Sequence, residues 1–505
     1  MMSSPRQRPL KKRKFNFPFS PFSEAAALAL VGALVLALLM LPPMVGLANN
    51  GDFERVMHWG KFEYLTTDYF DKHFGWVNRE FRITRSPLLT WWGYGSSEAI
   101  FVKLSALLGS LLIPGRLFDI RLLGVIHVLA FLLSLWTLMK GWQASTGSPP
   151  LLLIPIFALI FCDIGYLAYF HSFYCEPATL IFLLLTVGTG LYLAGQEKKQ
   201  TWMLVVFFLS ALCFVSAKLQ NVPLVLPLLL FSGRLFSLRP EAAWRKTVVA
   251  LSALLVSGSV FLYALTPRNM KDANKFNGTF NGILKDSPSP RQDLQELGLD
   301  EQYAVLAGTV FFNPHPPLEI KSPEFREGFF NRMNHLKLIR FYLTHPGRFL
   351  SKLKVTAQKG YTLRPDDLGN FEKQAEMGFG TKARRWSLWS SFKQHSLPKS
   401  LWFLTTYLLL LAGLIFKDYW KAEETTSRVT LEFYLALLLM IPIAFVTPIL
   451  GEGETDLEKH MFLFNALFDL SLLVLFGRLL GAVYRTVKTH TWRLGAKEHS
   501  FSVGV

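Results

Sequence analysis

Long apolar stretches separated by short polar segments run along almost the whole chain of 505 residues. Each stretch is close to the length of about 20 residues with which a helix crosses the hydrocarbon core of a bilayer. The pattern therefore predicts an all-α polytopic membrane protein. We expect ten transmembrane helices, at residues 25–46, 118–138, 151–170, 177–194, 201–216, 222–236, 247–265, 400–416, 430–450 and 461–483.

A further apolar stretch at 99–113 has a different character. It contains Lys103 and ends at Pro114 and Gly115, so we expect a helix that lies in the membrane interface. If this stretch crossed the membrane, every later loop would change sides. The positive-inside rule favours the ten-helix topology, because that topology places the basic clusters in the cytoplasm. These clusters are at 6–14, 140, 198–199, 234–246, 417–428 and 485–497.

The composition agrees with a membrane protein. Hydrophobic residues make up 51% of the chain and charged residues 18%, whereas about a quarter of a soluble protein is charged. The net charge is +17, but no segment combines a basic stripe with stacking aromatics, so we expect no nucleic acid partner. The basic residues instead set topology and meet anionic membrane lipid. The three cysteines have the spacing of neither a disulfide framework nor a zinc site.

Two outer segments are long enough to hold more than a turn. The segment 47–117 follows the first helix. The segment 266–399 contains helical runs at 323–343 and 346–359, so we expect a small, mostly helical extracytoplasmic subdomain there. The chain then divides into a cytoplasmic basic tail (1–24), a transmembrane module with the first outer loop (25–265), the subdomain, the C-terminal transmembrane helices (400–483) and a cytoplasmic tail (484–505).

Polar side chains collect in the outer turns, although topology alone does not require them there. They follow the first helix and lie between the third and fourth, the fifth and sixth, and the ninth and tenth helices. The set comprises Asp52, Glu54, Arg55, His171, Tyr174, Glu176, Lys218, Gln220, Asn221, Asp456, Lys459 and His460. Polar groups that converge at one membrane face predict an active site or a ligand cleft.

Transfer of a sugar from a lipid-linked donor is the chemistry that fits this set. Asp52 would be the base that deprotonates an acceptor hydroxyl, and Glu54 or Glu176 would orient the acceptor. Asp52 and Glu54 could also hold a divalent cation, Mg²⁺ or Mn²⁺, as a cofactor. The departing phosphate would be stabilised by the cations Arg55, Lys218, Lys459 and His460.

The same residues also have purely structural interpretations. Asn50, Gly51 and Asp52 are residues typical of a turn. Glu176 could simply begin a helix, where an acid suits the helix dipole. Lys218 could extend to the membrane interface, and the acidic residues of 452–458 could form a solvated loop.

The arrangement resembles the GT-C superfamily of membrane glycosyltransferases, which includes protein O-mannosyltransferases and lipid A aminoarabinose transferases. An acidic motif in a long first outer loop, interfacial helices in that loop and paired helices with short outer turns carry the resemblance, over roughly residues 20–265. Three motifs look similar, more narrowly, to bacterial hexose transferases of S-layer and cell-surface glycan synthesis. They are Asn50-Gly51-Asp52-Phe53, Ser216-Ala217-Lys218-Leu219-Gln220-Asn221 and Glu454-Thr455-Asp456-Leu457-Glu458-Lys459-His460-Met461-Phe462-Leu463-Phe464-Asn465.

The resemblance implies an inverting transfer of a sugar, here expected to be a hexose, from a polyprenyl-phosphate-linked donor to a surface glycan or glycolipid. It implies a multi-pass protein of the plasma (inner) membrane with both termini cytoplasmic and the active site extracytoplasmic. By the same resemblance Asp52 is the catalytic acid, Glu54 the second acid of the motif, and Glu176 the acid between the third and fourth helices. The resemblance does not identify the particular sugar or the particular acceptor, and it does not establish whether the reaction depends on a metal.

Two other functional classes stay open. A flippase or transporter of lipid-linked glycans would be expected to show internal repeats or paired broken helices, which the sequence lacks. A glycan polymerase or ligase that uses a pyrophosphate-linked donor would use Arg and His residues of a large outer loop. The segment 266–399 does contain Arg291, His315, His335 and Arg364.

Overall fold

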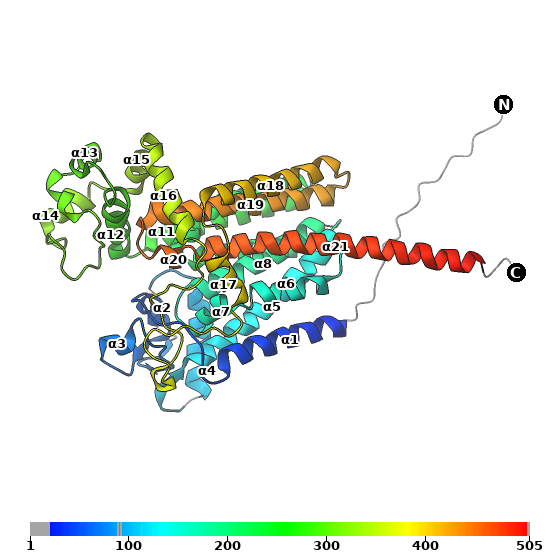
Figure 1. Cartoon of the computed structure of the whole chain (residues 1–505), viewed down its shortest axis with the longest axis horizontal. Coiled ribbons are helices and arrows are strands. Elements are labelled where there is room, and N and C mark those ends of the chain that lie inside the picture. Colours follow the sequence, from blue (N-terminus) through cyan, green and yellow to red (C-terminus); the bar gives the residue numbers. More distant parts are fainter. Residues whose placement is uncertain (1–20, 88–89, 91–92, 113, 199, 502–505) are drawn as a thin grey trace.

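The computed structural model describes residues 21–87, 90, 93–112, 114–198 and 200–501. Long helices run side by side along the longest axis of the molecule, and two lobes built from the outer segments lie at one end of this bundle (Figure 1). Most of the predicted basic tail and residues 502–505 lie outside the described residues. The chain is an all-α polytopic membrane protein, as its apolar pattern predicts.

Eight helices in the described part of the chain are long and apolar enough to cross a membrane. Each overlaps one of the ten predicted helices. They are α1 (Pro21–Met40), α5 (Ile120–Thr146), α8 (Glu176–Gly195), α10 (Val225–Ser237) with the helical turn before it, α11 (Ala242–Leu265), α18 (Leu401–Lys421), α19 (Thr425–Glu452) and α21 (Phe462–Phe501).

The third predicted helix, 151–170, is not one continuous helix. The helix that ends with α6 (Ile154–Ile160) meets the one that begins with α7 (Ile164–Leu167) at an angle of 71°. Asp163 explains the break, because its side chain accepts a hydrogen bond from the backbone N–H of Gly165 at 2.7 Å and so caps a new helix. The fifth predicted helix is α9 (Thr201–Ala217), whose 17 residues span about 25 Å, less than a full hydrocarbon core.

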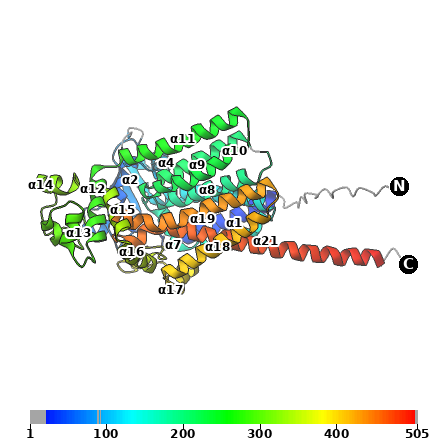
Figure 2. The same ribbon diagram turned by 90° about the horizontal axis from the view of Figure 1, so that it is seen from above.

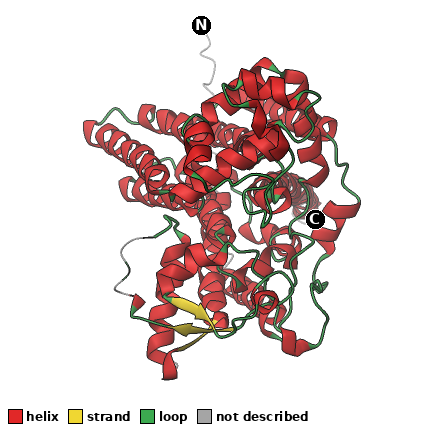
Figure 3. Ribbon diagram, turned by 90° about the vertical axis from the view of Figure 1, so that its left-hand side faces the viewer, coloured by secondary structure: helices red, strands yellow, loops and turns green. Residues whose placement is uncertain are grey.

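The first outer segment holds the expected helices, α2 (Phe53–Gly60), α3 (Tyr69–Lys72) and α4 (Glu98–Leu112). It also holds a three-stranded antiparallel sheet that the sequence did not indicate, in the order β1-β2-β3 (Figure 3). The strands are too short to give a recognisable alternating pattern. They are β1 (Phe62–Tyr64), β2 (Glu80–Ile83) and β3 (Leu117–Asp119).

One face of this sheet anchors the turn between α7 and α8. In the register of the sheet, Phe81 lies opposite Phe118. The rings of Phe62, Phe81 and Phe118 surround the ring of Phe173, with centroids 5.2, 5.0 and 6.4 Å away. Aromatic contacts at these distances are favourable, so the sheet holds the turn that leads to Glu176.

The first two thirds of the second outer segment are largely helical and form the lobe beyond the end of the bundle in Figure 2, whereas α17 (Leu388–His395) lies beside the membrane helices. The predicted run 346–359 is one helix. The run 323–343 is interrupted, because the side chain of Asn334 accepts a hydrogen bond from the backbone N–H of Lys337 at 3.0 Å and starts a new helix. The α-helices of this segment are α12 (Arg268–Phe276), α13 (Pro290–Glu296), α14 (Pro323–Phe325), α15 (His335–Thr344), α16 (Pro346–Lys359) and α17 (Leu388–His395).

Candidate active site

Asp52 ends a short loop whose backbone is held in one conformation. The side-chain oxygen of Asn49 accepts hydrogen bonds from the backbone N–H groups of Gly51 at 2.7 Å and Phe53 at 3.1 Å. Gly51 has a φ of 103°, a conformation that residues with a side chain rarely adopt. The loop therefore presents Asp52 in a fixed position directly before α2.

A segment far away in the sequence lies against this loop. Residues 369–371, which we call the strap, accept hydrogen bonds from the backbone N–H groups of Gly46 and Ala48 at 3.1 and 3.0 Å. The buried side chain of Asn370 donates to the carbonyl of Gly46 at 2.7 Å. The strap thus fixes the chain that leads into the Asp52 loop. No pattern in the sequence indicated this contact.

Two cations contact the Asp52 carboxylate. Lys459 forms an ion pair with one oxygen, and the guanidinium of Arg55 lies 2.8 Å from the other. Burial raises the pKa of the Asp52 carboxyl, but the charges of Lys459, Arg55 and Lys218 outweigh it and hold the pKa well below its ordinary value. Asp52 is therefore ionised at neutral pH and can accept a proton.

Lys459 comes from α20 (Leu457–His460), the short helix between α19 and α21. Its side chain is 2% exposed, and its ammonium lies 5.3 Å from the centre of the Tyr174 ring. The carboxylate of Asp456 is 3.9 Å from that ammonium and accepts a hydrogen bond from the side chain of Asn50 at 3.2 Å. The turn between α19 and α21 is thus tied to the Asp52 loop at two points.

Tyr174 completes this connection. Its hydroxyl donates to the carbonyl of Ala48 at 2.9 Å and accepts from the backbone N–H of Asn50 at 3.0 Å. Because the phenol is occupied by the loop, Tyr174 positions Asp52 in the structure.

A second ion pair lies beside the first. The ammonium of Lys218 is 2.8 Å from the carboxylate of Glu176, whose side chain is 3% exposed. Burial lowers the pKa of Lys218, but the carboxylates of Glu176 and Asp52 outweigh it and raise the pKa above its ordinary value. Since the charges of Lys218 and Asp52 act on each other, the two ion pairs form one electrostatic site. We call these residues, Asp52, Arg55, Glu176, Lys218 and Lys459, the Asp52 cluster.

His460 joins this site to the end of α19. Its ring lies 3.2 Å from the carboxylate of Glu452, and its backbone carbonyl accepts a hydrogen bond from the side chain of Gln220 at 2.6 Å. Glu452 belongs to the acidic residues 452–458 of the outer turn between the ninth and tenth predicted helices, but no role of its own was predicted for it. Its position at the end of a long apolar helix is the signal that points to a partner, because a carboxylate at a membrane boundary is rarely without one.

Three of the predicted site residues are not brought to the Asp52 cluster. Glu54 accepts a hydrogen bond from Asn49 at 3.3 Å and lies 3.6 Å from His73. The buried side chains of His171 and Asn221 contact backbone carbonyls at 2.7 and 2.9 Å. Buried side chains that contact backbone carbonyls in this way typically stabilise the packing of the protein.

A cavity of about 190 Å³ opens beside Lys459. It forms where the Asp52 loop, the chain after α16 and the turn around α20 meet. Its wall carries four carboxylates, one side-chain amide and two lysines, and such polar groups suit the hydroxyl groups of a ligand. It is lined by Asn50, Lys359, Pro365, Asp367, Glu454, Asp456, Leu457, Glu458 and Lys459.

The arrangement of Asp52 and Glu54 does not fit the predicted divalent cation. Two cations already flank Asp52 and would repel a metal ion, and Glu54 is engaged with Asn49. Within the described ranges, no group of three or more His, Cys, Asp or Glu side chains could hold a metal ion. We therefore assign no step to a metal.

Two solved structures are similar to this chain. One is the crystal structure of the Archaeoglobus fulgidus oligosaccharyltransferase tethered to an acceptor peptide with the NVT sequon, which is 12% identical with a TM-score of 0.40 and covers 93% of this chain and 51% of that one. The other is the oligosaccharyltransferase AglB of Archaeoglobus fulgidus in complex with an inhibitory peptide and a dolichol-phosphate, which is 14% identical with a TM-score of 0.39 and covers 93% and 52%. The chain spans about half the length of these two proteins.

No curated protein matches the sequence. The family model of the YfdI N-terminal transmembrane domain matches residues 11–498, almost the whole chain. The chain therefore belongs to the family of the YfdI N-terminal transmembrane domain.

Proposed function

We propose that this protein is an inverting glycosyltransferase of the GT-C type that transfers a hexose from a polyprenyl-phosphate-linked donor to a surface glycan or glycolipid. The arrangement around Asp52 supports this function most directly. An ionised carboxylate lies among the cations Lys459, Arg55 and Lys218 at one end of a bundle of membrane helices. A lipid-linked phosphate delivered at the extracytoplasmic face needs cations at this place, and the acceptor needs a base.

The reaction is a single displacement at the anomeric carbon. The acceptor hydroxyl attacks C1 of the donor sugar from the side opposite the phosphate, and Asp52 takes the proton of that hydroxyl. A bond forms between the acceptor oxygen and C1 while the bond between C1 and the phosphate oxygen breaks. Polyprenyl phosphate leaves with the electron pair, and Lys218 and Arg55 stabilise its added negative charge. Attack from the opposite side inverts the anomeric configuration.

Lys459 couples donor binding to the activation of the base. Its ammonium contacts Asp52 in the structure, and a donor phosphate competes for the same ammonium. When the phosphate draws Lys459 away, the pKa of Asp52 rises toward its ordinary value. The carboxylate then accepts a proton more readily.

The cavity beside Lys459 supplies the place for the acceptor. Its carboxylates, among them Asp456 and Glu458, accept hydrogen bonds from sugar hydroxyls. An acceptor held there lies next to the ion pair of Lys459 and Asp52. The hydroxyl to be glycosylated is thereby brought to the base.

The position of the charges distinguishes this function from transport. A transporter binds its substrate near the midplane of the bilayer, whereas Lys459 lies in the turn before α21 and Lys218 in the turn after α9. Arg364, a candidate for polymerase chemistry, donates to the side chain of Asn370 in the strap at 2.6 Å. Its contact is therefore structural.

A transfer assay with purified protein in nanodiscs tests the proposed function. Each member of a panel of polyprenyl-phosphate hexoses is supplied, and the release of polyprenyl phosphate is measured. Cleavage of one donor is the expected result. If no donor is cleaved, and a lipid-linked glycan accumulates on one leaflet in cells that lack the protein, the transporter is the better explanation.

Replacing Lys459 by Gln is expected to move the acid limb of the pH profile to higher pH. In the wild type, the pKa of Asp52 lies below its ordinary value of 3.8, so kcat/KM is lost only in strong acid. Without Lys459 the pKa of Asp52 rises, and protonation removes the base at a higher pH. The measurement is kcat/KM against pH, since this ratio reports the free enzyme. An acid limb at the wild-type position would contradict the role of Lys459.

Replacing Lys218 by Met is expected to weaken donor binding about tenfold, because a charge-assisted hydrogen bond to the phosphate is lost. Binding of a donor analogue and of an acceptor saccharide would be measured separately, and acceptor binding should change little. Lys373→Met is the control, since that side chain is 60% exposed and pairs with Asp71. Donor affinity that is equal in both variants and the wild type would remove Lys218 from the site.

A further inference from the structure

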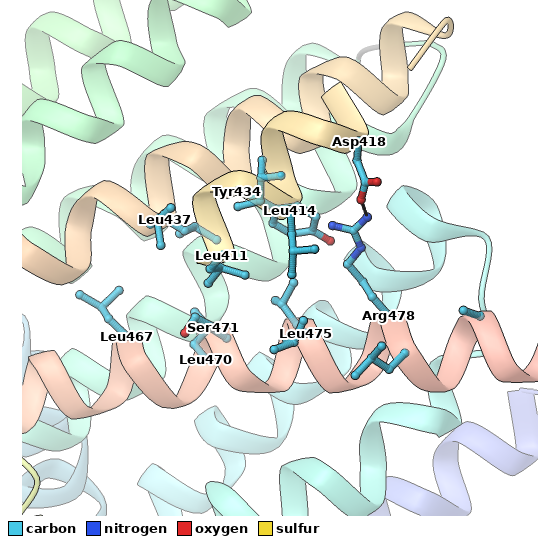
Figure 4. Close-up of a pocket in the computed structure, with 15 residues that line it drawn as sticks. Leu411, Leu414, Asp418, Tyr434, Leu437, Leu467, Leu470, Ser471, Leu475 and Arg478 are labelled. Atoms are coloured by element: carbon cyan, nitrogen blue, oxygen red, sulfur yellow. Dashed lines mark hydrogen bonds and ion pairs between the residues drawn. The ribbon is translucent and has the colours of Figure 1, made fainter. Parts of the chain in front are cut away.

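A second cavity lies in the membrane-spanning part of the bundle, away from the Asp52 cluster. It measures about 250 Å³ and lies between α18, α19 and α21, as Figure 4 shows. Apolar side chains of all three helices form its walls, such as Leu411, Leu437 and Leu475. The ion pair of Arg478 and Asp418 lies at one end. We call this cavity the groove.

The groove opens to the outside of the bundle. Leu414 and Leu479 at its rim are 46% and 54% exposed. The helix α18 forms one wall. It is a peripheral helix, because only 11% of its most apolar stretch of 18 residues is buried. In a bilayer these exposed leucines contact lipid chains, which are as apolar as the leucines themselves. A lipid chain can therefore enter the groove from the side.

The position of the ion pair along α21 identifies the leaflet. The helix begins at Phe462, close to Lys459 of the Asp52 cluster. Arg478 lies about 24 Å further along the helix axis. Because the hydrocarbon core is about 30 Å thick, the ion pair lies near the membrane face opposite the Asp52 cluster. The lining of the groove on α21 runs from Leu467 to Ala482, about 22 Å, which accommodates one acyl chain.

The end of the groove at this opposite face is suited to a phosphate. Asp418 engages one terminal nitrogen of the Arg478 guanidinium, which has five N–H donors in a planar fork that matches phosphate oxygens. The Arg478 side chain is 33% exposed and accessible from the lipid. Lys417 and Lys421 lie near the same end of α18, and Glu423 and Glu424 follow soon after it. Arg478, by contrast, is a cation that lines the groove itself.

We propose that the groove binds an anionic phospholipid of the leaflet opposite the Asp52 cluster. One acyl chain lies between α18 and α21, and Arg478 binds the phosphate. The position along α21 favours this lipid over the polyprenyl donor, whose phosphate has to reach the other face of the membrane. The bound lipid fills the space that separates the peripheral α18 from α21 and so stabilises the C-terminal helices.

Native mass spectrometry of the full-length protein tests this site, with phosphatidylglycerol and phosphatidylcholine supplied at equal molar ratios. The wild type should retain phosphatidylglycerol about tenfold better. Arg478→Gln should abolish that preference, because a charge-assisted contact to phosphate is lost. Leu475→Trp should reduce retention of both lipids by filling the groove. Arg234→Gln is the matched control, since it breaks an ion pair with Glu432 at the same end of the bundle but outside the groove.

Helical circular dichroism and gel filtration establish that each variant is folded. Equal retention of the two lipids by the wild type overturns the proposal. So does an equal loss of phosphatidylglycerol in Arg478→Gln and Arg234→Gln, since general surface charge would then explain the preference. Displacement of bound phosphatidylglycerol by polyprenyl phosphate in the wild type would assign the groove to the donor lipid and overturn the proposal as well.

Discussion

The Asp52→Asn variant is expected to transfer sugar about a thousandfold more slowly than the wild type, within the range in which a general base contributes to catalysis. The amide keeps the shape of the side chain but cannot take the acceptor proton. Donor binding should persist or become tighter, because Lys459 is then free of its ion pair with Asp52. Single-turnover release of polyprenyl phosphate measures the chemical step, and binding of a donor analogue measures affinity separately.

Glu54→Gln provides the comparison within the same motif. Glu54 contacts Asn49 and His73 instead of the cations of the Asp52 cluster, so its replacement should lower turnover by only a few fold. Near-normal turnover of Asp52→Asn would refute the assignment of the base. A thousandfold loss in Glu54→Gln, with an unchanged melting temperature, would restore the role for Glu54 that the sequence motif suggests.

Replacing Lys393 by Met is expected to destabilise the folded protein by about 3–5 kcal/mol, the usual cost of breaking a buried ion pair from one side. Lys393 of α17 lies 2.9 Å from Asp469 of α21, and both side chains are fully buried. Asp469 also accepts hydrogen bonds from Tyr166 at 2.5 Å and Trp389 at 2.9 Å. Without the ammonium, a buried carboxylate has no counter-charge. Thermal unfolding in detergent measures the loss.

The double variant Lys393→Met and Asp469→Asn separates charge from packing. Removing both charges should recover most of the lost stability, because the amide oxygen can still accept hydrogen bonds from Tyr166 and Trp389. Lys373→Met is the exposed control and should leave the melting temperature nearly unchanged, because an ion pair in water contributes little to stability. If the double variant is as unstable as the single one, the uncompensated charge is not the cause.

The membrane-spanning fold was predictable because each helix must itself carry enough apolar residues to cross the bilayer. The parts of the fold that were not predicted depend on contacts between residues far apart in the sequence, which a local pattern of apolar residues does not contain. Asp163 breaks the third helix because it can cap a new one and also accept from the backbone N–H of Ser390 at 2.9 Å. The small outer sheet was missed because its strands have only three or four residues each and are held together by contacts among Phe62, Phe118 and Phe173, which lie far apart in the sequence.

The candidate site was predictable in part. Asp52, Lys218 and Lys459 were found because charges at a membrane boundary are costly unless they have partners. His171 and Asn221 lie in the same outer turns as Glu176 and Lys218, but their side chains contact backbone carbonyls instead of the charges of the cluster. The pairing of each acid with its cation depends on tertiary structure, and so it could not be derived from the order of residues along the chain.

The distance in sequence between Asp52 and Lys459 has a consequence for biosynthesis. The two residues are 407 positions apart, so a ribosome that adds about 5–20 residues per second needs roughly 20–80 s to pass from one to the other. During that interval the first outer loop emerges with Arg55 but without Lys459. A nascent chain therefore lacks the complete Asp52 cluster until its last helices enter the membrane.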